Sequence, residues 1–236
     1  MRPGDPDVPA DVAGERPVVV PGRGVARSRN AAIDHAGRRY LLFCDDDVTV
    51  DLPGVLAAVD HLRETGAALA LGRATNPAGR FRKRYARRAR RLTLFSSAKA
   101  ATYEMLVDVD QVRAAGLRFD ERFGAGAQHH LGDEYLFVAA MLRAGLRADA
   151  VPITVAVHPA ESSGSRWGGS DVRARAVVLN EVFGRWAAPV RLAFAVRAAR
   201  RLGSLRAVAA LAGDGTRAEP LSRATSSDAL SHPGPR

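Results

Sequence analysis

The spacing of apolar and polar residues switches repeatedly between a strand period and a helix period along this chain. Short apolar runs with polar boundaries predict strands at 17–20, 40–44, 67–71, 103–107 and 148–153. Apolar residues at helical spacing predict helices over 25–36, from 51 to a stop at 66, and over 134–144. The run 40–44 lies between two arginines and three aspartates, as is typical of a buried parallel strand. This alternation predicts an α/β fold with a mostly parallel sheet flanked by helices.

Both ends of the chain have compositions typical of disorder. Residues 1–17 contain four prolines and three aspartates, and 213–236 is a mixture rich in Gly, Pro, Ser and Thr. We therefore expect a disordered leader at 1–17, a folded region at 18–170, a basic amphipathic helical extension at 171–212 and a disordered tail at 213–236. No internal repeat is visible.

Length and cysteine content narrow the class of protein. The chain has 236 residues, of which 47% are hydrophobic, enough for a sizeable core. Cys44 is the single cysteine, which excludes an internal disulfide. The N-terminus lacks the pattern of a signal peptide, and the apolar stretches are shorter than the roughly 20 residues of a spanning helix. These features predict a cytoplasmic protein.

Positive charge is concentrated in one part of the chain. The formal net charge is +10, and eight of the twelve residues in 80–91 are basic. Such charge attracts phosphates, nucleic acid or an anionic bilayer. A nucleic-acid-binding protein is therefore one hypothesis, but no known binding motif accompanies the run, and a solvated helix face is favoured over it. A third hypothesis adds the segment 172–211, where arginines alternate with apolar residues, and predicts peripheral contact with an anionic membrane. Docking of the apolar face of this segment on the catalytic domain is the alternative, and it is the commoner fate of such helices.

Three aspartates, Asp45, Asp46 and Asp47, follow the apolar run 40–44. Ligands bind open α/β sheets at the carboxyl ends of their strands, where these side chains are expected. Clustered carboxylates repel one another unless a cation or hydrogen bonds compensate, and Mg²⁺ or Mn²⁺ with substrate phosphates would do so. A solvated turn that caps the next helix is an equally good interpretation of this pattern alone.

Two further segments are candidates for chemistry. Asp120, Glu121, Phe123 and Gly124 precede a glycine-containing loop, after which Asp133 and Glu134 open the predicted helix 134–144. One of these two carboxylates could act as a general base, although acids in a first turn also simply complement the helix dipole. His158 follows the last strand, and a neutral imidazole there is either a loop residue or a Mn²⁺ ligand.

Taken in order, these segments resemble family 2 glycosyltransferases of the GT-A fold. Gly24 to Ile33 is similar to the helix that carries the family's Ala-Arg-Asn signature, and Leu41 to Asp47 matches its apolar strand and Asp-x-Asp motif. Residues 119–124 resemble the acceptor loop, 133–134 the acidic pair, and 158–164 the closing loop. The resemblance covers about 18–170, which we expect to be a GT-A-like catalytic domain followed by C-terminal helices. This domain would be N-terminally shortened, because it lacks the usual first strand-helix-strand of the family.

The resemblance implies an inverting, hexosyltransferase-type enzyme that uses a nucleotide-diphosphate sugar, of the kind that builds cell-envelope polysaccharides. It implies a divalent cation, Mn²⁺ or Mg²⁺, held by Asp47 with Asp45 and His158. Asp45 and Asp46, together with Arg27, Arg29 and Asn30 of the helix, would contact the donor. Asp120, Glu121, Phe123 and Gly124 would form the acceptor loop.

The resemblance also implies a catalytic base and an acceptor. Glu134 takes the position of the base, with Asp133 as the alternative. The acceptor would be a hydroxyl of a glycan or of a lipid-linked molecule, at the inner face of the plasma membrane.

One other enzyme class fits part of the pattern. Asp45 to Thr49 matches the Asp-x-Asp-x-Thr string of haloacid dehalogenase-type phosphatases. That family needs a later aspartate near Phe137, and the position is apolar, so this interpretation ranks lower.

Overall fold

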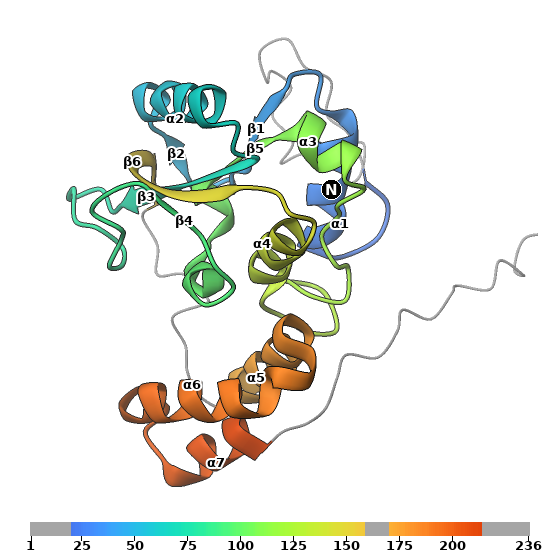
Figure 1. The fold of residues 1–236 in the computed structure, drawn as a ribbon, viewed down its shortest axis with the longest axis vertical. Coiled ribbons are helices and arrows are strands. Elements are labelled where there is room, and N and C mark those ends of the chain that lie inside the picture. Colours follow the sequence, from blue (N-terminus) through green and yellow to red (C-terminus); the bar gives the residue numbers. More distant parts are fainter. Residues whose placement is uncertain (1–19, 159–169, 214–236) are drawn as a thin grey trace, which may run out of the picture.

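A computed structural model of the chain describes residues 20–158 and 170–213 (Figure 1). Its α-helices are α1 (Val25–His35), α2 (Leu52–Thr65), α3 (Val109–Ala114), α4 (Asp133–Arg143), α5 (Ser170–Phe183), α6 (Ala187–Leu202) and α7 (Leu205–Gly213). Its strands are β1 (Tyr40–Leu42), β2 (Thr49–Val50), β3 (Leu69–Thr75), β4 (Arg90–Arg91), β5 (Met105–Asp108) and β6 (Ala148–Val157). Three short 3₁₀ segments are η1 (Ser96–Lys99), η2 (Thr102–Glu104) and η4 (Gly184–Trp186). The predicted α/β class is confirmed, while nearly all of the strand predicted at 17–20 lies outside the described residues.

The strands form one sheet in the order β1-β5-β3-β6-β2, with β4 also paired to β6. Strands β1, β3 and β6 run in the same direction, but β5 lies between β1 and β3 and is antiparallel to both. Strands β2 and β4 are antiparallel to β6, so β3–β6 is the one parallel pair among the described strands. The prediction of a mostly parallel sheet is therefore wrong in its pairing. An apolar run indicates burial, and it carries no information on strand direction.

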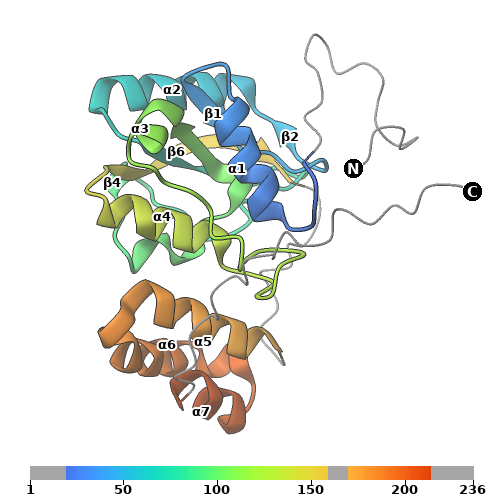
Figure 2. The same ribbon diagram turned by 90° about the vertical axis from the view of Figure 1, so that its right-hand side faces the viewer.

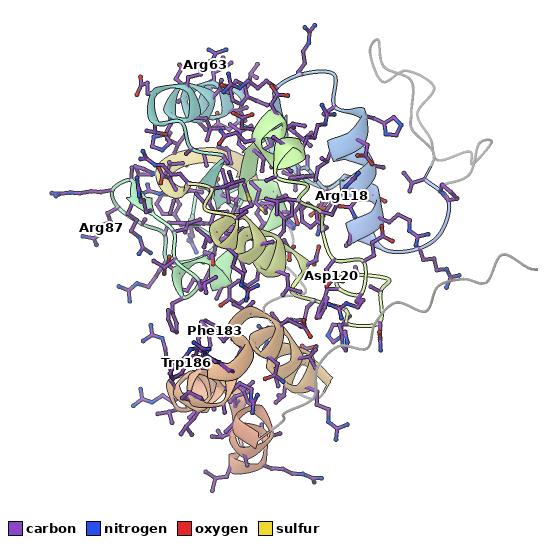
Figure 3. The ribbon with its side chains drawn as sticks, turned by 45° about the vertical axis from the view of Figure 1, so that its right-hand side comes forward. Arg63, Arg87, Arg118, Asp120, Phe183 and Trp186 are labelled. Carbon is purple, nitrogen blue, oxygen red and sulfur yellow. The ribbon has the colours of Figure 1, made fainter. Side chains whose placement is uncertain are left out.

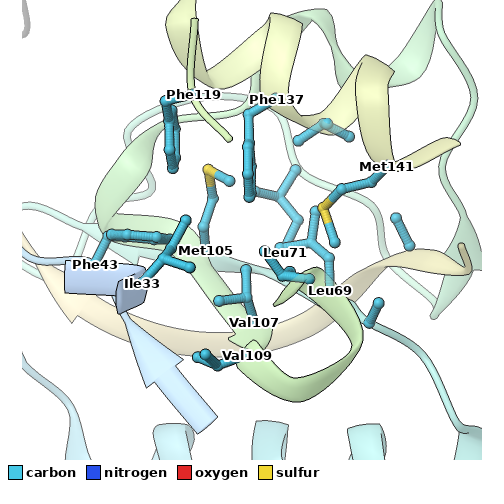
Figure 4. Close-up of a cluster of buried hydrophobic side chains, with 14 of the residues drawn as sticks. Ile33, Phe43, Leu69, Leu71, Met105, Val107, Val109, Phe119, Phe137 and Met141 are labelled. Atoms are coloured by element: carbon cyan, nitrogen blue, oxygen red, sulfur yellow. The ribbon is translucent and has the colours of Figure 1, made fainter. Parts of the chain in front are cut away.

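Each face of the sheet is covered by helices, and alternate residues of the strands supply the two cores. Leu69, Met105 and Val107 point toward α1 and α4, where Phe119 stacks on Phe137 with ring centroids 4.0 Å apart (Figure 4). The intervening residues of β3 and β5 face the opposite way and pack with Ala58 and Leu62 of α2. The sheet is thus packed against apolar side chains on both faces.

The C-terminal helices form a further layer beneath α4 (Figure 2). Apolar residues of α5 pack against α4 and against the inner faces of α6 and α7, in a buried cluster that includes Phe123 and Tyr135. The described part of the chain contains no helix that is long and apolar enough to cross a membrane.

The arginine-rich run 80–91 is a loop that ends in β4, so the prediction of a solvated helix face is wrong. Distant partners hold its inward side chains. Lys83 forms an ion pair with the buried Glu104 at 2.7 Å, and Tyr85 donates a hydrogen bond to the same carboxylate at 2.7 Å. Arg82 donates to the carbonyl oxygen of His158 at 3.1 Å. These contacts direct the run to two separate places, the Glu104 carboxylate of η2 and the end of β6.

Candidate active site

The three aspartates lie directly after β1, at the edge of the sheet. The backbone N–H of Phe43 bonds to the carbonyl of Met105, and a turn then closes with the N–H of Val48 donating to the carbonyl of Asp45 at 3.2 Å. Asp45, Asp46 and Asp47 are all exposed, with 45% of the Asp45 side chain and 46% of the Asp47 side chain accessible. They are thus available to a ligand.

Arg29 of α1 joins these aspartates to the acidic pair at the start of α4. Its guanidinium forms an ion pair with Asp133, lies 3.7 Å from Oε1 of Glu134 and lies 4.0 Å from Oδ1 of Asp45. The Arg29 side chain is only 11% exposed, so its charge is weakly screened. The Arg29 guanidinium therefore faces Asp45 and also the adjacent Asp133 and Glu134, which follow about ninety residues later in the sequence.

The two members of the acidic pair have different surroundings. The side chain of Asp133 is 3% exposed, whereas that of Glu134 is 24% exposed. Asp133 is therefore enclosed with Arg29, and Glu134 remains partly accessible to solvent. Both stand in the first turn of α4, where the helix dipole favours negative charge.

Two glycines allow this arrangement. Gly124 has φ +97°, and a Cβ atom there would lie 2.9 Å from Cγ of Asp133, so the loop that contains Gly124 packs directly on the acidic pair. Gly132 has φ +98°, and a Cβ atom there would lie 2.3 Å from a methyl group of Val178 in α5. Only glycine fits these contacts without displacing a neighbour.

Thr102, which the sequence analysis did not identify, donates a hydrogen bond from Oγ1 to Oε1 of Glu134 at 2.8 Å. It lies in η2, immediately before β5. Because β5 runs against β1, its beginning lies at the same edge as the end of β1 and the aspartates. A parallel β5 would have placed Thr102 at the other edge, so the wrong strand direction concealed this contact.

His158 lies at the end of β6, on the same edge. Its Nε2 is 3.7 Å from Oδ2 of Asp47, and its ring packs on that of Tyr103 with centroids 4.7 Å apart. Its backbone N–H bonds to the carbonyl of Thr75 at 2.9 Å. The residues predicted to complete the closing loop, 159–164, lie outside the described residues.

The environment of Asp45 disfavours its negative charge. Partial burial raises the pKa of Asp45, and repulsion from the nearby Glu134 and Asp47 raises it further, against the opposing effect of Arg29 and His158. Two carboxylates and an imidazole are a suitable donor set for Mn²⁺ or Mg²⁺, and a cation would relieve this repulsion. Within 20–158 and 170–213, however, no three His, Cys, Asp or Glu side chains converge closely enough to hold an ion by themselves.

The other predicted residues lie on the far side of α1 and in the loop beside it. Arg27 pairs with Glu121 at 3.0 Å, and the amide of Asn30 bonds to both the N–H and the carbonyl of Phe119. These residues border an open hollow of about 570 Å³, lined by Val20, Arg27, Asn30, Ala31, Asp34, Arg118, Phe119, Asp120 and Glu121. The hollow does not include the Asp45–Glu134 cluster.

Asp120 and Phe123 have structural partners. The Arg122 guanidinium offsets the effect of burial and lowers the pKa of Asp120, with which it pairs at 2.6 Å. Phe123 is fully buried and stacks on His129. Contacts with Arg122 and His129 therefore hold Asp120 and Phe123 of the predicted acceptor loop. Glu121 pairs with Arg27 of α1, and Gly124 packs beside Val25 of the same helix.

The comparisons with known proteins concern the family and the fold of the chain. The sequence model described as "Glycosyl transferase family 2" matches residues 16–121, and no curated protein matches the chain. The structure of S. aureus TarS 1–349 in complex with UDP-GlcNAc is 14% identical, with a TM-score of 0.52, and the match covers 78% of this chain and 54% of that one. The TarS complex with UDP is 16% identical, with a TM-score of 0.51, and the match covers 74% and 51%.

The likeness to TarS confirms the GT-A-like fold, and the chain spans about half the length of those TarS structures. The family match covers α1, β1 and the three aspartates, which carry part of the resemblance in the sequence, and it ends before the acidic pair Asp133 and Glu134. Residues 16–121 are therefore similar to family 2 glycosyltransferases, and the fold of the chain is similar to that of TarS.

Proposed function

We propose that this protein is an inverting glycosyltransferase that moves a sugar from a nucleotide-diphosphate sugar to a hydroxyl of a glycan or lipid-linked acceptor. One observation carries the proposal: Arg29 brings the Asp-x-Asp carboxylate Asp45 together with Asp133 and Glu134 at one edge of the sheet. The family match and the TarS complexes with UDP and UDP-GlcNAc support a nucleotide-sugar donor.

The donor diphosphate belongs beside the aspartates. Asp47, His158 and Asp45 would hold a divalent cation, with diphosphate oxygens completing the ligand set. When bound, the cation offsets the negative charge that develops on the leaving nucleoside diphosphate. Arg29 supplies a fixed positive charge at the same edge, and the exposed Asp46 is available to the nucleoside part.

Glu134 is the proposed base. The acceptor oxygen attacks the anomeric carbon as the bond from that carbon to the diphosphate oxygen breaks, and Glu134 takes the hydroxyl proton. Glu134 is accessible, and its hydrogen bond from Thr102 directs one oxygen, which leaves the other for the acceptor. Asp133, enclosed with Arg29, is a positioning residue.

Calorimetry with a panel of nucleoside diphosphates and their sugars in the presence of Mn²⁺ tests donor binding. Wild-type protein is expected to bind at least one donor, and Asp47→Asn to weaken that binding by about tenfold or more, because a charged contact is lost. Asp60→Asn, at an exposed aspartate of α2 away from the aspartate cluster, is the control. Equal donor affinity in wild type and Asp47→Asn would refute the cation assignment.

The phosphatase alternative has no support in this geometry. The position where that family needs a second aspartate is Phe137, which is 1% exposed and stacked in the core.

The nucleic-acid alternative rests on the basic run 80–91. Two of its side chains, Arg82 and Lys83, are engaged with His158 and Glu104 of the protein itself, which weakens this alternative.

A further inference from the structure

The C-terminal helices have an inner face that is covered and an outer face that is not. Helix α5 is largely buried against α4, while α6 and α7 lie at the end of the molecule opposite α2 (Figures 1 and 2). On α6, Ala195, Ala198 and Leu202 face the buried cluster. Residues on the opposite side of α6 are exposed, among them Leu192 and Val196.

That outer face is apolar where solvent-exposed helices are normally polar. Leu192 is 54% exposed and Val196 is 66% exposed, one turn apart on α6. Trp186, directly before α6, is 61% exposed, and Leu205 at the start of α7 is 88% exposed. Together with Ala188, Pro189, Ala193 and Ala199, which are also exposed, they form what we call the α6 surface.

The segment that carries the α6 surface has formal charges of a single sign. Residues 184–213 contain six arginines and no aspartate or glutamate. Arg191 is used internally, since it is 6% exposed and donates hydrogen bonds to the side chain of Asn180 and the carbonyl of Ala212. Arg185, Arg197, Arg200 and Arg206 are exposed beside the apolar residues. Trp186 lies against the guanidinium of Arg185, whose Cζ is 5.7 Å from the ring centroid.

An exposed apolar stripe bordered by arginines, with a tryptophan at its edge, matches the interface of an anionic bilayer. A second copy of the chain fits less well, because a two-fold contact through this face would bring positive charges together. We propose that the α6 surface docks this protein on anionic lipid membranes, with Leu192, Val196 and Trp186 inserted at headgroup depth. This inference is independent of the proposed catalytic activity.

Vesicle co-sedimentation of the full chain tests the proposal. We expect binding to vesicles of equal parts phosphatidylglycerol and phosphatidylcholine, weaker binding in high salt, and little binding to pure phosphatidylcholine. Leu192→Ser with Val196→Ser should abolish most of the binding. Leu52→Ser with Leu56→Ser is the matched control, since these α2 leucines are 61% and 57% exposed at the other end of the molecule.

Arginine variants separate a local contact from a general effect of net charge. Arg197→Gln with Arg200→Gln should weaken vesicle binding by about 30-fold. Arg87→Gln with Arg88→Gln removes the same charge from the exposed basic loop, away from Trp186 (Figure 3), and should have a much smaller effect. Trp186 fluorescence should shift to the blue on vesicle binding, and Trp186→Phe should lose that shift.

Three results would overturn the proposal. One is that anionic vesicles are ignored at low salt. The second is that the loop pair of arginines, or the α2 pair of leucines, matters as much as the α6 residues. The third is a concentration-dependent dimer in light scattering that the Leu192 and Val196 changes dissociate, because a second copy would then cover the α6 surface.

Discussion

Arg29 is the residue whose replacement most directly probes how the site is assembled. Arg29→Gln keeps a long polar side chain but removes the charge that faces Asp133, Asp45 and Glu134. We predict a large loss of folding stability, dominated by Asp133, because that carboxylate is left charged and almost fully buried.

The magnitude follows from the exposure of the Asp133 and Asp45 side chains. Breaking a buried pair by removing one partner costs about 3–5 kcal/mol, and the Asp133 side chain is 3% exposed. Asp45 is 4.0 Å from Arg29 and 45% exposed, so that contact is worth no more than about 1 kcal/mol. The α4 dipole stabilises the charge of Asp133 by only about 0.3–1 kcal/mol, so it offsets little of this loss. A chain of this size should therefore melt about 6–20 °C lower.

A double-mutant cycle in urea unfolding measures the coupling. Asp133→Asn alone leaves Arg29 buried with a neutral partner and should also destabilise. In the Arg29→Gln, Asp133→Asn double variant neither member of the buried pair is left charged without its partner, so it should be more stable than the sum of the single effects by about 2 kcal/mol. Additive effects within about 0.5 kcal/mol would refute the claim that these two residues act as one buried pair.

Three other predictions test individual contacts. Thr102→Val removes the hydrogen bond to Glu134 and should lower turnover about tenfold with unchanged donor affinity, which steady-state kinetics and calorimetry separate. Gly132→Ala should destabilise the fold by about 1–3 kcal/mol in urea unfolding, and Gly145→Ala, also at positive φ but with open space around it, should cost less. Burial raises the pKa of Asp149, but hydrogen bonds from Arg147 and His61 outweigh it and hold the pKa below its usual value. Asp149 thus adds stability above a pH of about 4 that is lost as the pH falls through its lowered pKa, and melting curves of Asp149→Asn should be less acid-sensitive.

Helix boundaries could be predicted from the sequence because their signals are local. Asp51 caps α2 by accepting a hydrogen bond from the N–H of Gly54, and Gly66 ends the helix with φ +65°. Both residues were identified as the start and stop from their type and spacing alone. The start of α4 at its acidic pair was predicted in the same way.

Strand direction and the loop 80–91 could not be predicted, since distant parts of the chain determine both. The strand β5 was expected among parallel neighbours, and its insertion between β1 and β3 depends on pairings with residues more than thirty positions away. The loop follows from Glu104, a buried carboxylate that requires partners and finds them in Lys83 and Tyr85.

The sequence nominates the acidic residues of the candidate site, but it does not indicate the contacts that join them. The order of motifs was enough to nominate Asp45, Asp47 and Glu134, because these residue types stand where strands end and a helix begins. The Arg29–Asp133 pair and the Thr102 hydrogen bond join segments that approach each other only in the folded sheet.

The most direct test of the proposed glycosyl transfer compares turnover with donor binding in Glu134→Gln. Release of the nucleoside diphosphate from a bound donor sugar, with and without a glycan acceptor, gives the turnover, and calorimetry gives the affinity. We predict that turnover falls about 10²- to 10⁴-fold, because glutamine cannot accept the proton, while donor affinity is unchanged. Asp133→Asn, measured below its melting transition, should retain more activity. Wild-type turnover in Glu134→Gln would contradict the account.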